Sequence, residues 1–186
     1  MEPVLFINAC FRDGSRTREL AEVVLQQLGG SYTEVKVDGT LPPLDHDRLH
    51  RRLALAGAAD FSDPMFDTAK QFKAAETIVI AAPYWDLSFP AALKAYIENI
   101  CVVGLTFYYL NDVPKTLCRA KRLIYVTTVG GYNPVDFGFS YVEGVAKTFF
   151  EIPEVQQFRA EALDIAGNDP GAIMAKAKQH VLDTLQ

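Results

Sequence analysis

Short apolar runs alternate along this chain with longer segments in which apolar residues recur at the period of an α-helix. The runs over residues 3–9, 77–82 and 122–128 are nearly all apolar, as expected for strands of a parallel sheet that is covered on both faces. Two further runs, residues 32–37 and 155–163, complete a set of five predicted strands. This alternation predicts an α/β fold, namely a doubly wound three-layer α/β/α sandwich with a five-stranded parallel sheet.

The helical segments carry apolar stripes with a spacing of three or four residues. Asp169 and Pro170 predict the start of the last helix as its cap and first-turn residue, and Pro90 predicts the first position of a middle helix. The 186 residues contain neither an internal repeat nor a linker, so we expect a single domain over residues 1–186. The stripes consist of Leu20, Val24 and Leu28, of Leu93, Ile97, Ile100 and Cys101, and of Ile173, Ala177, Val181 and Leu185.

The charge balance argues against nucleic acid as a partner. The chain has 18 Lys and Arg against 23 Asp and Glu, which gives a net charge of −5, and no basic run occurs. The first residues carry no basic leader pattern, and no apolar run reaches the roughly 18 residues that span a bilayer. We therefore expect a cytoplasmic protein without membrane contact. Three widely separated cysteines are expected to be reduced thiols.

The loop after the first predicted strand reads NACFRDGSRT, residues 8–17. In open parallel sheets the ligand lies beyond the carboxyl ends of the strands, where the strand order reverses. A helix that begins near Arg16 directs its free N–H groups and the positive end of its dipole into this loop. Ser15, Arg16 and Thr17 add two hydroxyls and a guanidinium, so we predict a phosphate site here. Ser15 is also a common helix cap, and the two roles can coexist.

Other phosphate-binding loops fit this stretch less well. The glycines of the GxxxxGK[ST] and GxGxxG motifs are missing after the first strand. Cys10 and Arg16 do have the spacing of a low-molecular-weight cysteine phosphatase, with Asp169 as a candidate general acid. Asp13 and the bulky Phe11 disfavour this hypothesis, because a loop that wraps a dianion prefers small, uncharged residues. The phosphatase remains a less favoured alternative.

Two histidines four residues apart, His46 and His50, resemble half of a zinc site. The remaining histidine is the distant His180, and Pro42 and Pro43 place the segment in a surface connection. No third ligand is apparent, so we predict no metal site.

The loops after the third and fourth predicted strands point to a planar ligand. Residues 83–87 (PYWDL) offer backbone amides and large aromatic rings. The adjacent glycines Gly130 and Gly131 let the backbone approach a flat ligand edge, and Tyr132 can cover its face. The alternative is that Tyr84 and Trp85 are only core aromatics, but that hypothesis does not explain why they cluster at the ligand edge of the sheet.

Four motifs, in this order, carry a resemblance to a known family: PAALKAYI (residues 90–97), GLTF (104–107), the glycine pair at 130 and 131, and AEALDIAGNDP (160–170). They resemble the flavodoxin-like NAD(P)H:quinone oxidoreductases, and especially their FMN-dependent azoreductase branch, over nearly the whole chain. The resemblance implies that FMN passes a hydride, through its N5, from NADH or NADPH to a quinone-type or azo acceptor. The protein then supplies binding and orientation, and no catalytic side chain is required.

The resemblance also implies positions for the site residues. Residues 15–17 are expected to hold the FMN phosphate near Cys10, residues 83–87 to line the isoalloxazine with main-chain N–H groups toward N5, and residues 128–132 to border its pyrimidine end. Phe107 is expected in the substrate pocket or at a dimer contact. The expected cofactor-binding residues are Cys10, Ser15, Arg16, Thr17, Pro83, Tyr84, Trp85, Asp86, Leu87, Thr128, Val129, Gly130, Gly131 and Tyr132.

Two departures from the family pattern leave the acceptor open, because Asp86 stands where that branch often has Asn and Val129 where it often has Arg. The choices between NADH and NADPH, and between FMN and FAD, stay open as well. A flavodoxin-type electron carrier has the same fold and cofactor and is the main alternative. Residues 91–110 hold more apolar side chains than one helical stripe can bury, so we expect a homodimer. Ile100 and Val103 are the candidates for its interface, and the alternative for either residue is a place in the internal core.

Overall fold

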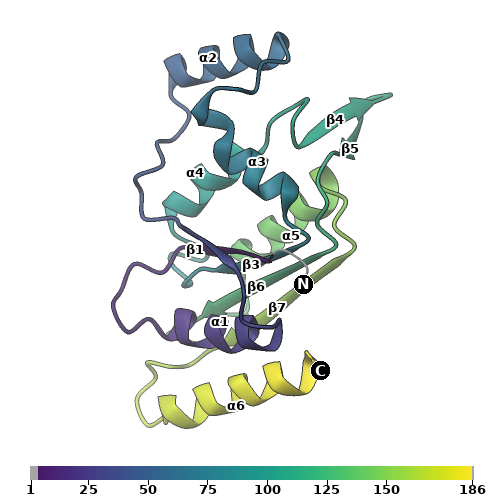
Figure 1. Ribbon diagram of the computed structural model, residues 1–186. Coiled ribbons are helices and arrows are strands. Elements are labelled where there is room, and N and C mark those ends of the chain that lie inside the picture. Colours follow the sequence, from purple (N-terminus) through teal and green to yellow (C-terminus); the bar gives the residue numbers. More distant parts are fainter. Residues whose placement is uncertain (1–3, 186) are drawn as a thin grey trace.

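In a computed structural model that describes residues 4–185, five strands form one parallel sheet (Figure 1). The strand order β2-β1-β3-β6-β7 places β2 and β3 on opposite sides of β1. Because the chain reverses direction across the sheet at this point, a crevice forms beyond the carboxyl ends of β1 and β3. The strands are β1 (Val4–Asn8), β2 (Thr33–Lys36), β3 (Thr77–Ala81), β6 (Arg122–Thr128) and β7 (Glu154–Ala160).

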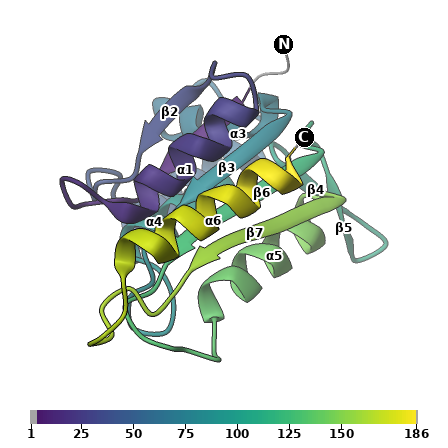
Figure 2. The ribbon, with the colours of Figure 1, turned by 90° about the horizontal axis from the view of Figure 1, so that it is seen from below.

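Helices cover both faces of this sheet, which confirms the predicted three-layer sandwich (Figure 2). On one face, Leu20 of α1 and Val181 of α6 pack with Phe6, Ile124 and Phe158 of the strands. The other face is covered by α3, α4 and α5, and α2 lies at the margin of that layer (Figure 1). The helices are α1 (Arg16–Gln27), α2 (His46–Gly57), α3 (Asp67–Ala74), α4 (Ala91–Ile100), α5 (Phe137–Phe149) and α6 (Pro170–Thr184), with a short 3₁₀ turn, η1 (Pro64–Phe66).

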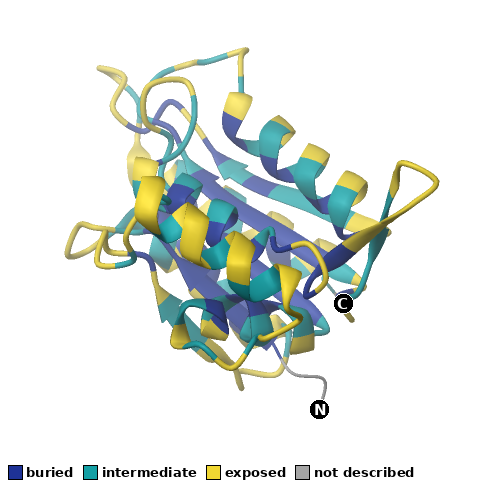
Figure 3. Cartoon of the chain, turned by 90° about the horizontal axis from the view of Figure 1, so that it is seen from above, coloured by how far each residue is buried: buried dark blue, intermediate teal, exposed yellow. Residues whose placement is uncertain are grey.

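The buried residues lie mainly in the strands, drawn in dark blue in Figure 3, whereas the outer faces of the helices are exposed. All five residues of β1 and all five of β3 are buried, as a strand covered on both faces requires. The apolar stripe predicted in the last helix packs on the core through Ile173, Ala177 and Val181. Hydrophobic burial on both faces of one sheet therefore accounts for the fold.

The predicted helix starts are confirmed to within one residue. Ser15 caps α1 by accepting a hydrogen bond from the backbone N–H of Arg18. Asp169 caps α6, which begins at Pro170 as predicted. Pro90 precedes α4 as its cap residue instead of occupying the first helical position.

Two predictions about local structure need correction, and part of a third lies outside the described residues. The predicted strand over residues 155–163 ends at Ala160, because the chain turns at Ala162 with φ +63°. The segment that contains His46 and His50 was predicted to be a surface connection; it is the helix α2, and none of its residues is buried, so only its place at the surface is confirmed. The first strand was predicted to begin at residue 3, which lies outside the described residues.

A β-hairpin that the sequence patterns did not predict follows α4. It consists of β4 (Phe107–Leu110) and β5 (Val113–Thr116), joined by Asn111 and Asp112 with φ +51° and +63°. Positive φ at both central residues is typical of a type I′ hairpin turn. The hairpin leads into the start of β6, so it lies at the amino-terminal edge of the sheet, away from the crevice (Figure 1). Within residues 4–185, no helix combines the length and the apolar character needed to cross a membrane.

Candidate functional site

The loop between β1 and α1 leaves unpaired donors at the crevice. Gly14 adopts φ +65°, a conformation that favours glycine, and lets the chain turn into the helix. The Ser15 side chain takes up the N–H of Arg18, at 3.3 Å. The N–H groups of Arg16 and Thr17, which are the first two of the helix, have no acceptor within residues 4–185. Together with the helix dipole, these two groups form a site suited to an anion.

Side chains from α1 connect this loop to the far side of the crevice. The hydroxyls of Thr17 and Thr128 lie 2.6 Å apart, and Thr17 is 1% exposed. The guanidinium of Arg16 donates to the carbonyl of Leu163 at 3.2 Å and to the Asp164 carboxylate at 2.6 Å. The Arg16–Asp164 ion pair forms one wall of the crevice and contributes little to stability, because its side chains are 35% and 64% exposed.

The loop after β3 forms an aromatic wall and a strained turn. Trp85 stacks on Phe11 with ring centroids 5.7 Å apart, which brings this loop against the loop after β1. Asp86 and Leu87, with φ +50° and +69°, form a two-residue turn in which the amides and carbonyls of Trp85 and Ser88 pair. Positive φ is unusual for a residue as bulky as leucine and is typical of functional sites. The N–H groups of both turn residues have no acceptor in the described part of the chain.

The loop after β6 approaches the segment that follows β7. The N–H of Asp164 donates to the carbonyl of Gly130 at 2.8 Å, and the N–H of Ala162 donates to that of Gly131 at 2.9 Å. A Cβ atom on Gly130 would lie 2.5 Å from a carboxylate oxygen of Asp164. Glycine is therefore required at position 130 unless the Asp164 side chain moves.

These three loops and the segment after β7 enclose a cleft with a volume of about 400 Å³. Nine of the fourteen predicted cofactor-binding residues line it, from three separate parts of the sequence. Opposite charges balance within it, because two arginines and two aspartates are among the lining residues. The predicted residues in the lining are Ser15, Arg16, Thr17, Pro83, Tyr84, Trp85, Thr128, Val129 and Gly130.

Five of the predicted cofactor-binding residues lie outside this lining. Asp86 and Leu87 form the turn just beyond Trp85, and Gly131 follows the lining residue Gly130. Tyr132 is 69% exposed and lines a neighbouring groove between β7 and α6 instead. Cys10 packs against the core on the α1 side and does not line the cleft.

Cys10 is poorly suited to nucleophilic chemistry. Its Sγ donates to the carbonyl of Ala81 at 3.7 Å, and burial raises the pKa of the thiol above its ordinary value of 9.0. A thiol nucleophile needs a lowered pKa. The arginine that a phosphatase would use, Arg16, points to Leu163 and Asp164. The geometry of both residues therefore argues against the cysteine phosphatase.

Phe107 does not belong to the cleft of its own chain. Its side chain is 4% exposed and packs against Phe149, with ring centroids 4.8 Å apart. It lies in the hairpin at the amino-terminal edge of the sheet, whereas the cleft lies at the carboxyl edge. Within its own chain the Phe107 ring fills the core, and its expected place in a substrate pocket or at a dimer contact stays a prediction.

Sequence reasoning missed six residues of the lining. Four of them belong to the loop between β1 and α1. Their position in this loop, directly before the predicted phosphate residues, could have identified them as lining residues. Leu163 and Asp164 follow β7, and only the order of the strands brings them to the Gly130 loop. The missed residues are Phe11, Arg12, Asp13, Gly14, Leu163 and Asp164.

The histidine pair on α2 remains apart from this site. The rings of His46 and His50 are 4.3 Å apart on the exposed helix. Among residues 4–185, no group of three or more His, Cys, Asp or Glu side chains is arranged to hold a metal ion.

Comparisons with known proteins agree with this architecture. The sequence profile of a family described by its flavodoxin-like fold matches residues 2–185. The FMN-dependent NADH:quinone oxidoreductase of Lachnoclostridium phytofermentans is 38% identical over 190 residues, covering 96% of each chain. The protein of the same name from Pseudomonas savastanoi pv. phaseolicola is 34% identical, covering 91% of each chain.

Solved structures support the same fold. An azoreductase from Bacillus anthracis superposes with a TM-score of 0.84 at 21% identity, covering 100% of this chain and 99% of that one. An FMN-dependent NADH-azoreductase from the same species, solved in complex with FMN, superposes with a TM-score of 0.82 at 20% identity and covers 98% and 97%. From the profile match and the full-length relatives, we conclude that this chain belongs to the flavodoxin-like family of FMN-dependent NADH:quinone oxidoreductases.

Proposed function

We propose that this protein is an FMN-dependent oxidoreductase that transfers two electrons from NADH or NADPH to a quinone-type acceptor. One observation supports it most, namely that free helix-terminal amides, an aromatic wall and a glycine loop face the same cleft. Relatives named FMN-dependent NADH:quinone oxidoreductase add to that support. An azo compound is the second acceptor class, in keeping with the names of similar structures.

The phosphate of FMN would be held at the start of α1. The free N–H groups of Arg16 and Thr17 supply donors, and the helix dipole favours a negative charge there. The guanidinium of Arg16 has five N–H donors, of which the contacts to Leu163 and Asp164 use only part. Arg16 would therefore neutralise Asp164 and contact the phosphate from the same position. The hydroxyls of Ser15 and Thr17 would lie beside the phosphate.

The flavin ring would be held by the two remaining loops. Pro83, Tyr84 and Trp85 offer a flat apolar wall, and the free N–H groups of the Asp86–Leu87 turn offer hydrogen-bond donors next to it. Residues 128–132 would border the other end of the ring, with Gly130 allowing close backbone approach. A cleft with free donors at one end and aromatic rings at the other fits a phosphorylated planar cofactor.

When bound, FMN supplies the hydride chemistry, and the chain supplies orientation and exclusion of water. The backbone donors of the strained turn are fixed in place before the cofactor binds, so they can stabilise negative charge without reorganising. No side chain of the cleft is needed as a general acid or base in this proposal. The three cysteines are free, in keeping with a reducing compartment such as the cytoplasm.

The working unit would be a homodimer. Five large apolar residues in and next to the hairpin are exposed, and we call them the hairpin patch. In a monomer these side chains contribute no hydrophobic stabilisation, because they remain in contact with water. Ile100, in contrast, is 2% exposed and belongs to the core, which is the alternative place expected for it. The hairpin patch consists of Val103 (51% exposed), Tyr108 (39%), Tyr109 (53%), Leu110 (51%) and Val113 (52%).

Dimerisation can be tested with a matched pair of variants. Tyr108 of the patch and Tyr32, which directly precedes the outermost strand β2, are each 39% exposed. Tyr108→Asp should shift sedimentation toward the monomer and reduce quinone reduction, whereas Tyr32→Asp should leave the assembly state unchanged. A wild-type protein that is monomeric and fully active at the assay concentration would refute the proposed dimer.

The proposed activity can be tested with the single tryptophan of the chain, Trp85, which lines the cleft. FMN added to apoprotein should quench the emission of Trp85, and the holoprotein should oxidise NADH or NADPH steadily in the presence of menadione. A protein that binds FMN but shows no such turnover without an added reductase would be an electron carrier. A colourless protein that binds no FMN and hydrolyses an aryl phosphate would contradict the whole proposal.

A further inference from the structure

An arginine outside the cleft lining links β7 to the loops that form it. Arg159 lies on β7, which is an edge strand, and its side chain is 19% exposed. Its neighbours Phe158 and Ala160 point into the core beneath α1 and α6. Because side chains alternate along a strand, Arg159 and Gln157 point to the opposite face, toward the start of α5.

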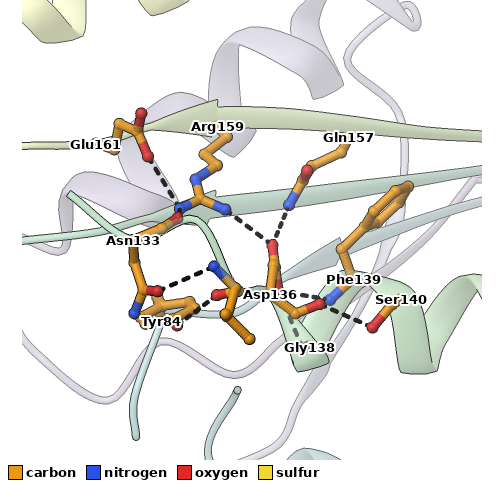
Figure 4. A network of polar contacts seen from close by, with 10 residues as sticks. Tyr84, Asn133, Asp136, Gly138, Phe139, Ser140, Gln157, Arg159 and Glu161 are labelled. Atoms are coloured by element: carbon orange, nitrogen blue, oxygen red, sulfur yellow. Dashed lines mark hydrogen bonds and ion pairs between the residues drawn. The ribbon is translucent and has the colours of Figure 1, made fainter. Parts of the chain in front are cut away.

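Arg159 holds three groups at once (Figure 4). Its Nη1 donates to Oδ2 of Asp136 at 3.2 Å, and its Nη2 donates to the backbone carbonyl of Asn133 at 2.7 Å. The same Nη2 lies 2.9 Å from a carboxylate oxygen of Glu161. The guanidinium therefore ties the segment over residues 133–136 to the end of β7.

Asp136 is the second fixed point of this network. One carboxylate oxygen accepts from the N–H groups of Gly138 and Phe139, each at 2.9 Å, and so caps α5. The other oxygen accepts from Gln157 at 2.7 Å and from Arg159. The segment before α5 is thus held from the helix on one side and from β7 on the other.

This segment in turn holds the loop that carries the aromatic wall. The hydroxyl of Tyr84 donates to the carbonyl of Val135 at 2.7 Å, and the N–H of Phe137 donates to the carbonyl of Leu87 at 3.1 Å. The guanidinium carbon of Arg159 lies 5.7 Å from the centre of the Tyr84 ring, within the range of a cation–π contact. The Tyr84 end of the 84–87 loop therefore contacts the segment that Arg159 fixes, and the Leu87 end contacts Phe137, the residue that directly follows this segment.

We propose that Arg159 is a positioning residue for the flavin site, which sets the place of the Tyr84 wall and the strained Asp86–Leu87 turn through the 133–136 segment. This inference rests on the proposed function, because it assigns a role in holding FMN. Arg159 itself is absent from the cleft lining, so its effect is transmitted through Tyr84 and the backbone.

A purely stabilising role explains the network less well. An ion pair as buried as Arg159–Asp136, with side chains 19% and 14% exposed, loses much of its attraction to desolvation. The Nε of Arg159 is buried with no partner among the described residues. Packed apolar side chains would stabilise this face as well, but they would not fix the direction of the 133–136 backbone.

The test compares the FMN affinity of three variants with that of the wild type, measured through quenching of Trp85 emission in apoprotein. Arg159→Met keeps length and packing and removes the charge, whereas Arg159→Lys keeps the charge and loses the planar fork. Ile152→Val is the control, since Ile152 is 1% exposed in the connection before β7, away from the cleft. The thermal midpoint of each apoprotein reports general loss of stability.

We expect Arg159→Met to raise the FMN dissociation constant by about tenfold, because the released loop would hold its binding-competent position only about a tenth of the time. Arg159→Lys should fall between this variant and the wild type. The Trp85 emission maximum of the Arg159→Met apoprotein should also shift to longer wavelength, because the neighbouring loop is released, whereas Ile152→Val should alter neither property.

Two results would overturn the inference. In the first, Arg159→Met binds FMN as tightly as the wild type. In the second, the affinity of Arg159→Met falls no more than that of Ile152→Val at a similar thermal midpoint. If Arg159→Met does not fold, the Arg159→Lys variant replaces it, and an FMN affinity equal to that of the wild type would then overturn the inference. A wild-type protein that binds no FMN would instead refute the proposed function, so the two failures are distinguishable.

Discussion

Replacing Arg16 tests the proposed phosphate site at the start of α1, which has the carboxylate of Asp164 beside it. In the structure, Arg16 is 2.6 Å from Asp164, and these side chains are 35% and 64% exposed. An ion pair this exposed contributes about 0.2–1 kcal/mol to stability. Arg16→Ala should therefore lower the thermal midpoint only slightly, by no more than about 2–4 °C.

The effect on FMN affinity should be much larger than the effect on stability. Loss of one charge-assisted hydrogen bond to the phosphate is worth about 1.5–3 kcal/mol, which is at least tenfold in the dissociation constant. The unpaired Asp164 then adds repulsion of about 1 kcal/mol in a solvent-exposed cleft. Removing Asp164 as well should recover this repulsion, so the double variant Arg16→Ala/Asp164→Ala should bind FMN more tightly than Arg16→Ala alone.

The assay is titration of apoprotein with FMN, followed by Trp85 emission, for the wild type, the two single variants and the double variant. Asp164→Ala alone should bind FMN at least as tightly as the wild type, because Arg16 is then free for the phosphate. The reasoning is refuted if Arg16→Ala leaves the affinity unchanged. It is also refuted if Asp164→Ala weakens binding as much as Arg16→Ala does, because the pair would then act only as a structural unit.

Three further predictions concern single sites. Leu87→Gly should be more stable toward urea than Leu87→Ala by about 1 kcal/mol, because only glycine adopts positive φ without strain; equal urea midpoints would contradict strain at this turn. Cys10→Ser should retain FMN binding and most of the quinone reduction, and loss of turnover with FMN still bound would indicate thiol chemistry. The pKa of Glu151 is lowered from 4.5, first by the N–H of Thr116 and then by Lys115, so its contribution to stability is present above pH 4.5 and is lost as the pH falls through the lower folded value. In the Glu151→Gln variant the thermal midpoint should therefore depend less on pH in this acid range. An unchanged pH dependence would show that the hydrogen bond from Thr116 of the hairpin to Glu151 does not contribute to stability.

Much of the fold follows from local patterns that the sequence displays. The nearly all-apolar runs predicted β1, β3 and β6 because strands covered on both faces have no polar side. Ser15 and Asp169 marked helix starts because their side chains satisfy free N–H groups of the first turn. The order of these elements also placed the ligand loops after β1, β3 and β6, since parallel strands bring their carboxyl ends to one edge.

Other features depended on contacts between residues far apart in the sequence. Arg16 and Asp164 are separated by 148 residues, and only the sheet order brings them together. The sequence left open whether Ile100 lies in an interface or in the core, and the structure buries it together with Phe107, because the hairpin and α5 supply partners that periodicity does not reveal. The direction of Cys10 was equally hidden, since a thiol at a strand end can face either a cleft or a core.

The proposed role of Arg159 could not be predicted from the residues next to it in the sequence. In the sequence it is one arginine within the last of the five predicted strands, and nothing nearby suggests a role. Its partners Asp136 and Tyr84 come from two other loops, and they meet it because β7 pairs with β6 in a register that places Ala160 beside Thr128. Local propensities determine which residues form strands, helices and caps, whereas strand register and side-chain packing over long sequence distances determine which side chains share a site.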